Sequence, residues 1–180
     1  MRRGSTRADL HHLTGGVDLT QIDGFTPYTA LGLIAEIGTD MSRWPTEKHF
    51  TSWLTLAPKN RISGGRLLSA RTGRSANRAA GLLRLVVMSL GRTHTALGAS
   101  YRRLAARIGK PQAITATARK LAVLVYRVLK GQLVYRDMGA DHYDAQQRAR
   151  VLNGLRRRAA TLGFDLMNRQ TGEVFNAARA

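Results

Sequence analysis

Apolar residues recur at helical spacing along most of the chain, and turn residues divide that pattern into segments. Thr26 is predicted to cap a first helix that has Pro27 in its first turn and ends at Gly38. Further helices are predicted from about residue 46 to a stop at Pro58, and over residues 76–92, 95–107, 112–130 and 144–162. The pattern therefore predicts an all-α fold, with a helix-hairpin-helix-like turn near the N-terminus followed by a small helical bundle.

The apolar spacing also indicates which side chains each helix buries. Ser75 is the expected cap of the helix over residues 76–92. Residues expected to be buried include Leu85, Val151, Leu155 and Leu162. The two tryptophans and the tyrosines fit apolar helix positions better than an exposed stacking platform, so we expect them in the core as well.

Glycine, proline and charge suggest how the chain is divided. Residues 1–16 lack apolar periodicity and are expected to be a loose leader. Residues 17–165 form the expected helical domain, with a helix-hairpin-helix-like part over 17–56 and a serine-bearing loop and bundle over 57–165. Residues 166–180 are expected to be a tail.

The composition excludes several classes of protein and site. The chain has no cysteine, which rules out a disulfide framework, a thiolate zinc site and a cysteine nucleophile. Its apolar runs are far shorter than the ~20 residues that a membrane span needs, and the N-terminus does not resemble a secretory signal. A cytoplasmic protein that does not associate with a membrane is therefore expected.

The positive charge is concentrated in one segment. From Lys48 to Arg136 there are 18 Lys or Arg and no Asp or Glu, so this segment carries the whole formal net charge of +18. Such a surface repels itself unless phosphates or counterions neutralise it, which favours nucleic acid as the partner. An arginine-rich composition alone would not remove acids from 89 consecutive residues. DNA binding is therefore predicted, and it requires these arginines to share a face.

A basic, glycine-rich loop or short hairpin is predicted over residues 57–74, and it contains the candidate nucleophile Ser63. Gly64 and Gly65 would let a phosphodiester approach the Ser63 hydroxyl, while guanidinium groups would stabilise charge on the phosphorus. The cations expected to contact DNA here are Lys59, Arg61, Arg66, Arg71 and Arg74. Ser-Gly-Gly also occurs in ordinary flexible loops, and no acid or histidine is nearby in the sequence, so both interpretations stay open.

Two other segments are candidates for phosphate contacts. Gly24 and Thr26 belong to the turn that opens the first helix, where backbone amides can bind an anion; an ordinary capped turn is the alternative. Asn77, Arg78 and Arg84 would project from the next helix toward a bound backbone, unless they form a solvated edge. The histidines lack ligand spacing and the basic segment lacks carboxylates, so we predict no metal site and no bound cofactor in this chain.

Six short segments occur in an order that resembles one protein family. They are IAEIG (34–38), FTSWLTLAP (50–58), ISGG (62–65), NR (77–78), YRRL (101–104) and ARKLA (118–122). In this order they resemble the DEDD insertion-sequence transposases, which are related to the Piv and MooV DNA invertases. The resemblance covers roughly residues 17–165.

The resemblance implies a role in DNA transposition and recombination, with Ser63 as the nucleophile that forms a covalent phosphoserine link to DNA. It also implies a RuvC-like nuclease domain that holds Mg²⁺ through four acids. Because these residues match only the serine-bearing part, we expect the Mg²⁺ to belong to a missing N-terminal domain and the chain to be inactive without it. The resemblance further implies a homo-oligomeric intact enzyme and a structured RNA partner encoded by the element.

Two other hypotheses remain open. The chain could be a non-catalytic basic helical module that binds nucleic acid, such as a transposase remnant or regulator. It could also be a basic scaffold that binds only proteins, which DNA binding in low salt would exclude. A covalent DNA adduct would separate the transposase domain from the non-catalytic module.

Overall fold

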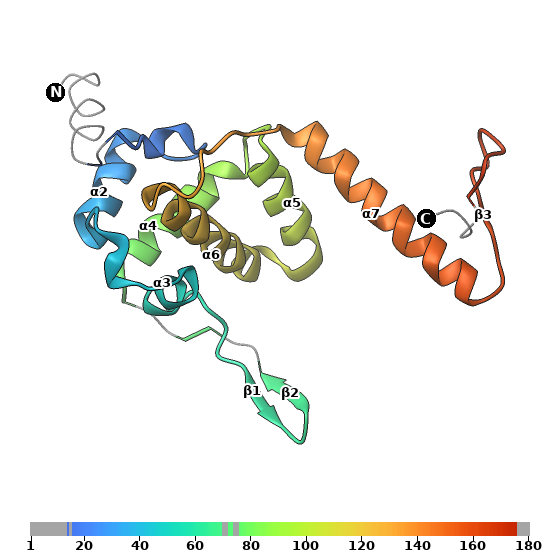
Figure 1. Ribbon diagram of the computed structural model, residues 1–180, viewed down its shortest axis with the longest axis horizontal. Helices are drawn as coiled ribbons and strands as arrows, with labels where there is room; N and C mark the ends of the chain where they lie inside the picture. The colour runs from blue at the N-terminus through green and yellow to red at the C-terminus, as the bar shows by residue number, and fades with distance from the viewer. Residues whose placement is uncertain (1–13, 15, 70–71, 74–75, 176–180) are drawn as a thin grey trace.

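The computed structural model describes residues 14, 16–69, 72–73 and 76–175 (Figure 1). These residues form six α-helices, two short 3-10 helices and two two-stranded antiparallel hairpins. In chain order the elements are η1 (Leu19–Gln21), α2 (Pro27–Ile37), η2 (Met41–Arg43), α3 (Glu47–Trp53), β1 (Arg61–Ser63), β2 (Arg66–Ser69), α4 (Arg78–Leu90), α5 (Ala96–Ile108), α6 (Lys110–Leu129), α7 (Ala140–Thr161), β3 (Leu166–Met167) and β4 (Val174–Phe175). The fold is therefore mainly α. The helical part of the all-α prediction is confirmed, and two short hairpins are present beside the helices.

Threonine caps define the starts of three helices where the sequence predicts them. The Thr26 hydroxyl accepts a hydrogen bond from the backbone N–H of Thr29, and Pro27 follows in the first turn of α2. This helix ends at Gly38, which has a φ of 75°. α3 and α5 also begin after a threonine whose side chain accepts a backbone hydrogen bond. These hydroxyls satisfy N–H groups that the first turn of a helix leaves unpaired.

Several helix ends differ from the prediction, among them the start of α7, which is Ala140 and not residue 144. α3 ends at Trp53, well before Pro58, because Thr55 adopts a left-handed φ of 55° and turns the chain. α4 is capped by Asn77, and the predicted cap, Ser75, lies outside the described residues. α6 begins two residues before the predicted start, because a proline is tolerated in the first turn, where its missing N–H has no helical partner.

The core surrounds α6, which packs against α3, α4 and α5 (Figure 1). Leu121 and Val125 of α6 have no exposed surface. Beside them, Trp44, Phe50 and Tyr126 form an aromatic cluster. The Tyr126 hydroxyl donates a 2.8 Å hydrogen bond to the backbone carbonyl of Trp44, so this buried polar atom is satisfied. The core prediction is confirmed for Trp44 and Tyr126.

Several residues predicted to be buried are exposed instead. In α7, Val151 and Leu155 are nearly half exposed, and no residue of this helix is buried. Leu162, which follows the helix, is 74% exposed. Leu85 on α4 and Tyr28 on α2 are also exposed, at 57% and 80%. These burial predictions are wrong because helical spacing identifies an apolar side of a helix but not whether another element covers it.

The turn before α2 differs from a helix-hairpin-helix unit. In the described residues, the three-residue helix η1 precedes it where such a unit would have an α-helix. Gly24 in this turn packs closely against α4: its carbonyl accepts a hydrogen bond from the Ser89 hydroxyl, and a Cβ would lie 3.0 Å from the Val86 carbonyl oxygen. Glycine is therefore needed at position 24 for the approach of two elements.

Candidate nucleic-acid interface

Ser63 lies near the tip of a hairpin that projects from the body of the molecule after α3 (Figure 1). We call residues 58–69 together with Thr72 the arm. Within the arm β1 pairs with β2, so that Ser63 is opposite Arg66, and an isolated bridge closes the base. The serine-bearing segment is thus a short hairpin, which is one of the two forms that the sequence allows.

Two glycines form the turn at the tip of the arm. Gly64 and Gly65 have φ values of 54° and 74°, and a two-residue type I′ turn requires positive φ at both central positions. A Cβ at either position would meet no other atom within 4 Å, so backbone conformation and not crowding favours glycine here. The tip therefore has no side chain that would keep a large ligand away from Ser63.

The Ser63 side chain is exposed, as attack on a phosphodiester requires. Its hydroxyl has no hydrogen-bond partner among the residues that the structure describes. No acid or histidine in that part of the chain is thus positioned to accept its proton. The described residues leave Ser63 accessible but do not activate it.

Three cations share the arm with Ser63, namely Lys59, Arg61 and Arg66, and all three are exposed. Within the described ranges, no acid forms an ion pair with any of them. Their charge is therefore available to neutralise phosphates. Arg71 and Arg74, which are also predicted to contact DNA, lie outside the described residues.

Three other predicted contact residues have a role in the fold itself. Thr26 and Asn77 cap α2 and α4, and the Asn77 side-chain amide also donates a 3.5 Å hydrogen bond to the Trp53 carbonyl. Gly24 packs against α4. Contact of these three residues with phosphates stays a prediction. Their capping and packing roles already account for the residue type at each position.

The two arginines predicted on α4 point in different directions. Arg84 follows Arg78 by six residues, which corresponds to a rotation of about 240° around a regular helix. The Arg78 Nε lies 3.2 Å from a carboxylate oxygen of Glu36 on α2, although 83% of the Arg78 side chain is exposed. Arg84 is only partly exposed. A single straight phosphate backbone would therefore not contact both from the same side.

A second ion pair links α6 to α3. Arg127 donates two hydrogen bonds, of 2.9 and 2.7 Å, to the carboxylate of Glu47. These bonds hold the pKa of Glu47 below its usual value and raise the pKa of Arg127. Like Glu36, Glu47 lies in the N-terminal flank of the acid-free segment, so both pairs use acids from outside that segment.

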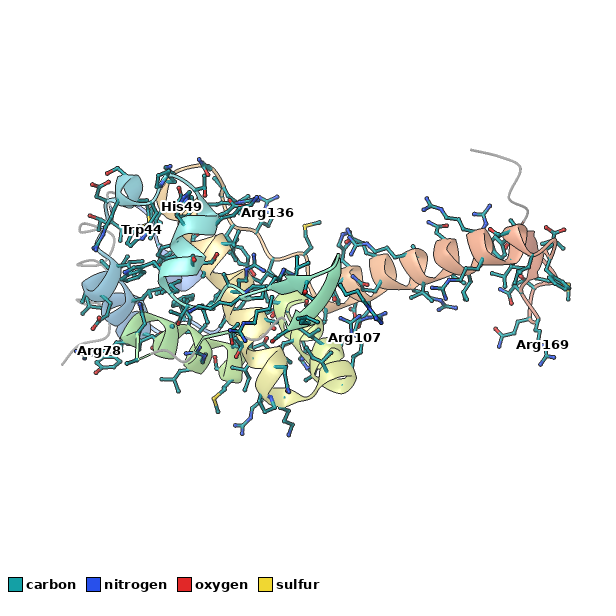
Figure 2. The ribbon with its side chains drawn as sticks, turned by 90° about the horizontal axis from the view of Figure 1, so that it is seen from below. Trp44, His49, Arg78, Arg107, Arg136 and Arg169 are labelled. Carbon is teal, nitrogen blue, oxygen red and sulfur yellow. The ribbon has the colours of Figure 1, made fainter. Side chains whose placement is uncertain are left out.

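Three arginines of the basic segment lie apart from one another on the body. Figure 2 shows Arg78, Arg107 and Arg136 at well-separated places on the body. These three residues belong to α4, to α5 and to the segment after α6. For the basic segment as a whole, a shared basic face stays a prediction. The arm remains the place where several cations accompany Ser63.

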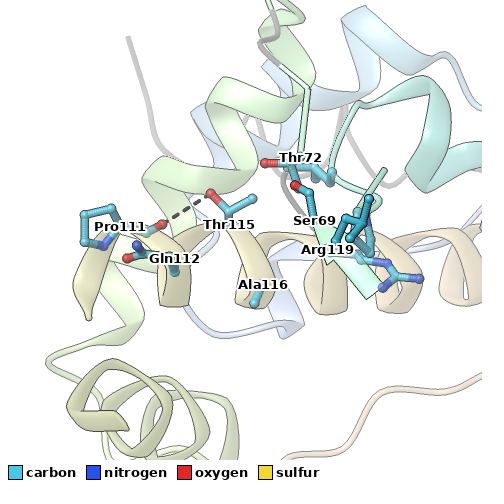
Figure 3. A pocket seen from close by; sticks show the side chains of 10 residues that line it. Ser69, Thr72, Pro111, Gln112, Thr115, Ala116 and Arg119 are labelled. Carbon is cyan, nitrogen blue, oxygen red and sulfur yellow. Dashed lines mark hydrogen bonds between the residues drawn. The ribbon is translucent and has the colours of Figure 1, made fainter. Parts of the chain in front are cut away.

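A groove separates the base of the arm from α6 (Figure 3). It has a volume of about 730 Å³, and its lining includes Leu56, Leu68, Thr115, Ala116 and Arg119. Arg119 is partly buried there. Sequence reasoning did not identify Arg119 as a site residue, because it is far from Ser63 along the chain and only tertiary packing brings it to the arm.

Two features are absent from the described residues. None of their helices combines the length and the apolar character that a membrane span requires. In the same part of the chain, no three His, Asp or Glu side chains gather so that they could hold a metal ion.

Comparison with protein families gives one match. Residues 18–102 match the model described as "Transposase IS116/IS110/IS902 family", a range that includes the arm and somewhat less than half of the 180 residues. No curated protein and no solved structure matches the chain.

Proposed function

We propose that this chain, whose residues 18–102 match the IS116/IS110/IS902 transposase family, binds DNA and presents Ser63 as the nucleophile of strand transfer. The family assigns the domain to mobile insertion sequences and DNA transposition. The observation that supports Ser63 is its exposure at the glycine tip of the arm, opposite Arg66 and two residues after Arg61.

In the proposed step, the Ser63 oxygen attacks a DNA phosphorus atom. A new oxygen–phosphorus bond forms, the bond from phosphorus to a deoxyribose oxygen breaks, and the phosphate stays linked to the serine. A general base accepts the proton of the Ser63 hydroxyl, and the released deoxyribose oxygen takes up a proton. Arg61 and Arg66 would stabilise the extra negative charge on the phosphate oxygens as the fifth bond forms. Attack on this phosphoserine by a second strand would complete the transfer and regenerate Ser63.

The proposal requires a partner domain. The Ser63 hydroxyl has no acid or histidine as a hydrogen-bond partner in the described ranges, so the proposal assigns the acceptance of its proton to another domain. The described acids also do not fit a Mg²⁺ site, and no metal-dependent step is assigned to them. As the family resemblance implies, the partner proposed here is a RuvC-like nuclease domain that carries Mg²⁺.

A covalent-adduct assay tests the role of Ser63. The chain and a RuvC-like nuclease domain of the same family are incubated with element-end DNA carrying a suicide nick, and DNA that stays bound to protein in denaturant is measured. Wild type is expected to give an adduct and Ser63→Ala to give none. Ser52→Ala, an exposed serine on α3, is the matched control and should behave as wild type. Equal adduct from Ser63→Ala would remove Ser63 from the mechanism.

The second candidate is a non-catalytic nucleic-acid-binding module. It is favoured by the observation that no described acid or histidine forms a hydrogen bond with the Ser63 hydroxyl. Both candidates predict that the logarithm of DNA affinity falls with the logarithm of salt concentration, by about 0.9 for each phosphate contacted. They differ in covalent chemistry. Salt-sensitive binding without any adduct from wild type in the presence of the nuclease domain would support the module.

A further inference from the structure

The groove between the arm and α6 combines apolar walls with an available positive charge. Leu68 contributes apolar surface from the arm, and Pro111 and Ala116 contribute it from α6. Figure 3 shows Pro111, Ala116 and Arg119 along α6 beside the groove. Leu68 is 68% exposed, so its side chain is available to a ligand in the groove. Arg119 at the same groove forms no ion pair or hydrogen bond with another described residue. An apolar surface beside an available guanidinium suits a ligand with a flat apolar part and a phosphate.

The groove also lies close to the proposed site of attack. Ser69 lines the groove and is paired with Arg61 across the hairpin. Arg61 precedes Ser63 by two residues on β1, which corresponds to about 7 Å along a strand. Leu68 and Ser69 also line a second hollow together with Lys59 and Arg61, so the cations of the arm adjoin the groove. A nucleotide next to the phosphate at Ser63 would therefore reach the groove with its base.

We propose that this groove binds the base of an unpaired nucleotide that flanks the phosphate attacked by Ser63, with Arg119 contacting a neighbouring phosphate. This inference rests on the proposed function and specifies its substrate: the strand must be unstacked at that position. A volume of about 730 Å³ falls in the range of sites for small ligands and is too small for a duplex. Paired bases are stacked inside a duplex and cannot enter such a groove, whereas an extruded base can.

The test compares DNA probes that differ only in pairing. One duplex carries a short unpaired patch that contains 2-aminopurine, and the other is fully paired with 2-aminopurine in the same place. Wild type is expected to bind the patched duplex about tenfold more tightly, the scale expected when one base leaves water for an apolar pocket. The 2-aminopurine fluorescence of the patched duplex should change on binding. Equal affinity for the two duplexes would overturn the proposal.

Variants locate the effect in the groove. Ala116→Trp, at an exposed position of α6, fills the groove. This variant should bind the patched and the paired duplex with about equal affinity, while binding to the paired duplex persists. Arg119→Ala should weaken binding of the patched duplex more than Arg92→Ala, which removes an exposed charge from the segment between α4 and α5. Ala149→Trp on α7 is the control for an added tryptophan. An unchanged preference in Ala116→Trp would place the unpaired base elsewhere.

The two proposals fail in different ways. If Ser63 is not the nucleophile, Ser63→Ala keeps the adduct while the preference for unpaired DNA and its loss in Ala116→Trp remain. If the groove does not bind the base, Ala116→Trp forms the adduct as well as wild type and keeps the affinity of wild type for both duplexes. Circular dichroism of each variant checks that its helices are intact, and absence of any DNA binding by wild type would overturn both proposals.

Discussion

The two longest described helices have opposite surroundings. α6 has 20 residues and α7 has 22, and both carry apolar residues at helical spacing. Eight residues of α6 are buried, whereas none of α7 is. The difference shows that the free energy of folding comes from the elements packed around α6, and that the apolar residues of α7 contribute little to it.

The largest expected effect comes from truncating the centre of α6. Leu121→Ala should lower the free energy of unfolding by about 2–5 kcal/mol, because it removes a fully buried side chain and leaves a cavity. Leu155→Ala on α7 should change it by no more than about 0.5 kcal/mol, because that side chain is already exposed. Urea denaturation followed by circular dichroism measures both. Similar losses in the two variants would show that α7 is packed in solution.

The next largest effects are expected at two helix glycines, where replacement by alanine should change the stability in opposite directions. A Cβ at Gly98 of α5 would lie 2.6 Å from the Leu90 carbonyl oxygen, so Gly98→Ala should destabilise the body by about 1–3 kcal/mol. A Cβ at Gly154 of α7 would meet no atom within 4 Å, so Gly154→Ala should stabilise that helix by about 0.5–1 kcal/mol. Thermal unfolding tests the first variant, and amide hydrogen exchange within α7 tests the second. Destabilisation by Gly154→Ala would contradict the open space around position 154.

The smallest effect concerns the ion pair between Glu47 and Arg127, which ties α3 to α6. The pKa of Glu47 is lowered in the folded state from a usual value of 4.5, so the pair stabilises the protein above that value and is lost as the pH falls through the lowered pKa. Glu47→Gln should therefore lower the melting temperature slightly at pH 7 and not at strongly acidic pH. Asp144→Asn on α7, which forms no ion pair with a described residue, is the control. A pH-independent difference for Glu47→Gln would show that the ion pair is not its cause.

The features that could be predicted from the sequence depend on neighbouring residues. Thr26 and Pro27 act on the first turn of α2, and Gly38 acts on its last turn, so the bounds of this helix follow from local residues. Gly64 and Gly65 favour a tight turn for the same local reason, and a hairpin was one of two forms expected around Ser63. Exposure of Ser63 follows from that turn.

The features that could not be predicted depend on contacts between distant segments. The spacing of Val151 and Leu155 resembles that of buried residues in α6, but the sequence does not show that these two side chains stay exposed while α7 contacts α5. The approach of Arg119 to the arm and the ion pair of Arg78 with Glu36 are also tertiary contacts between distant segments. The separation of Arg78, Arg107 and Arg136 has the same origin, because linear charge density does not determine which sides of the bundle the helices present.

The position of α6 has a consequence for synthesis on the ribosome. The segment that matches the transposase family ends at residue 102, within α5, while α6 spans Lys110–Leu129. The earlier helices therefore leave the exit tunnel before the helix that closes their core. Until residue 129 has emerged, their apolar sides are exposed to chaperones and to other nascent chains. A gene cut at the end of the matched segment would yield a polypeptide that has the serine arm but lacks the centre of its own fold.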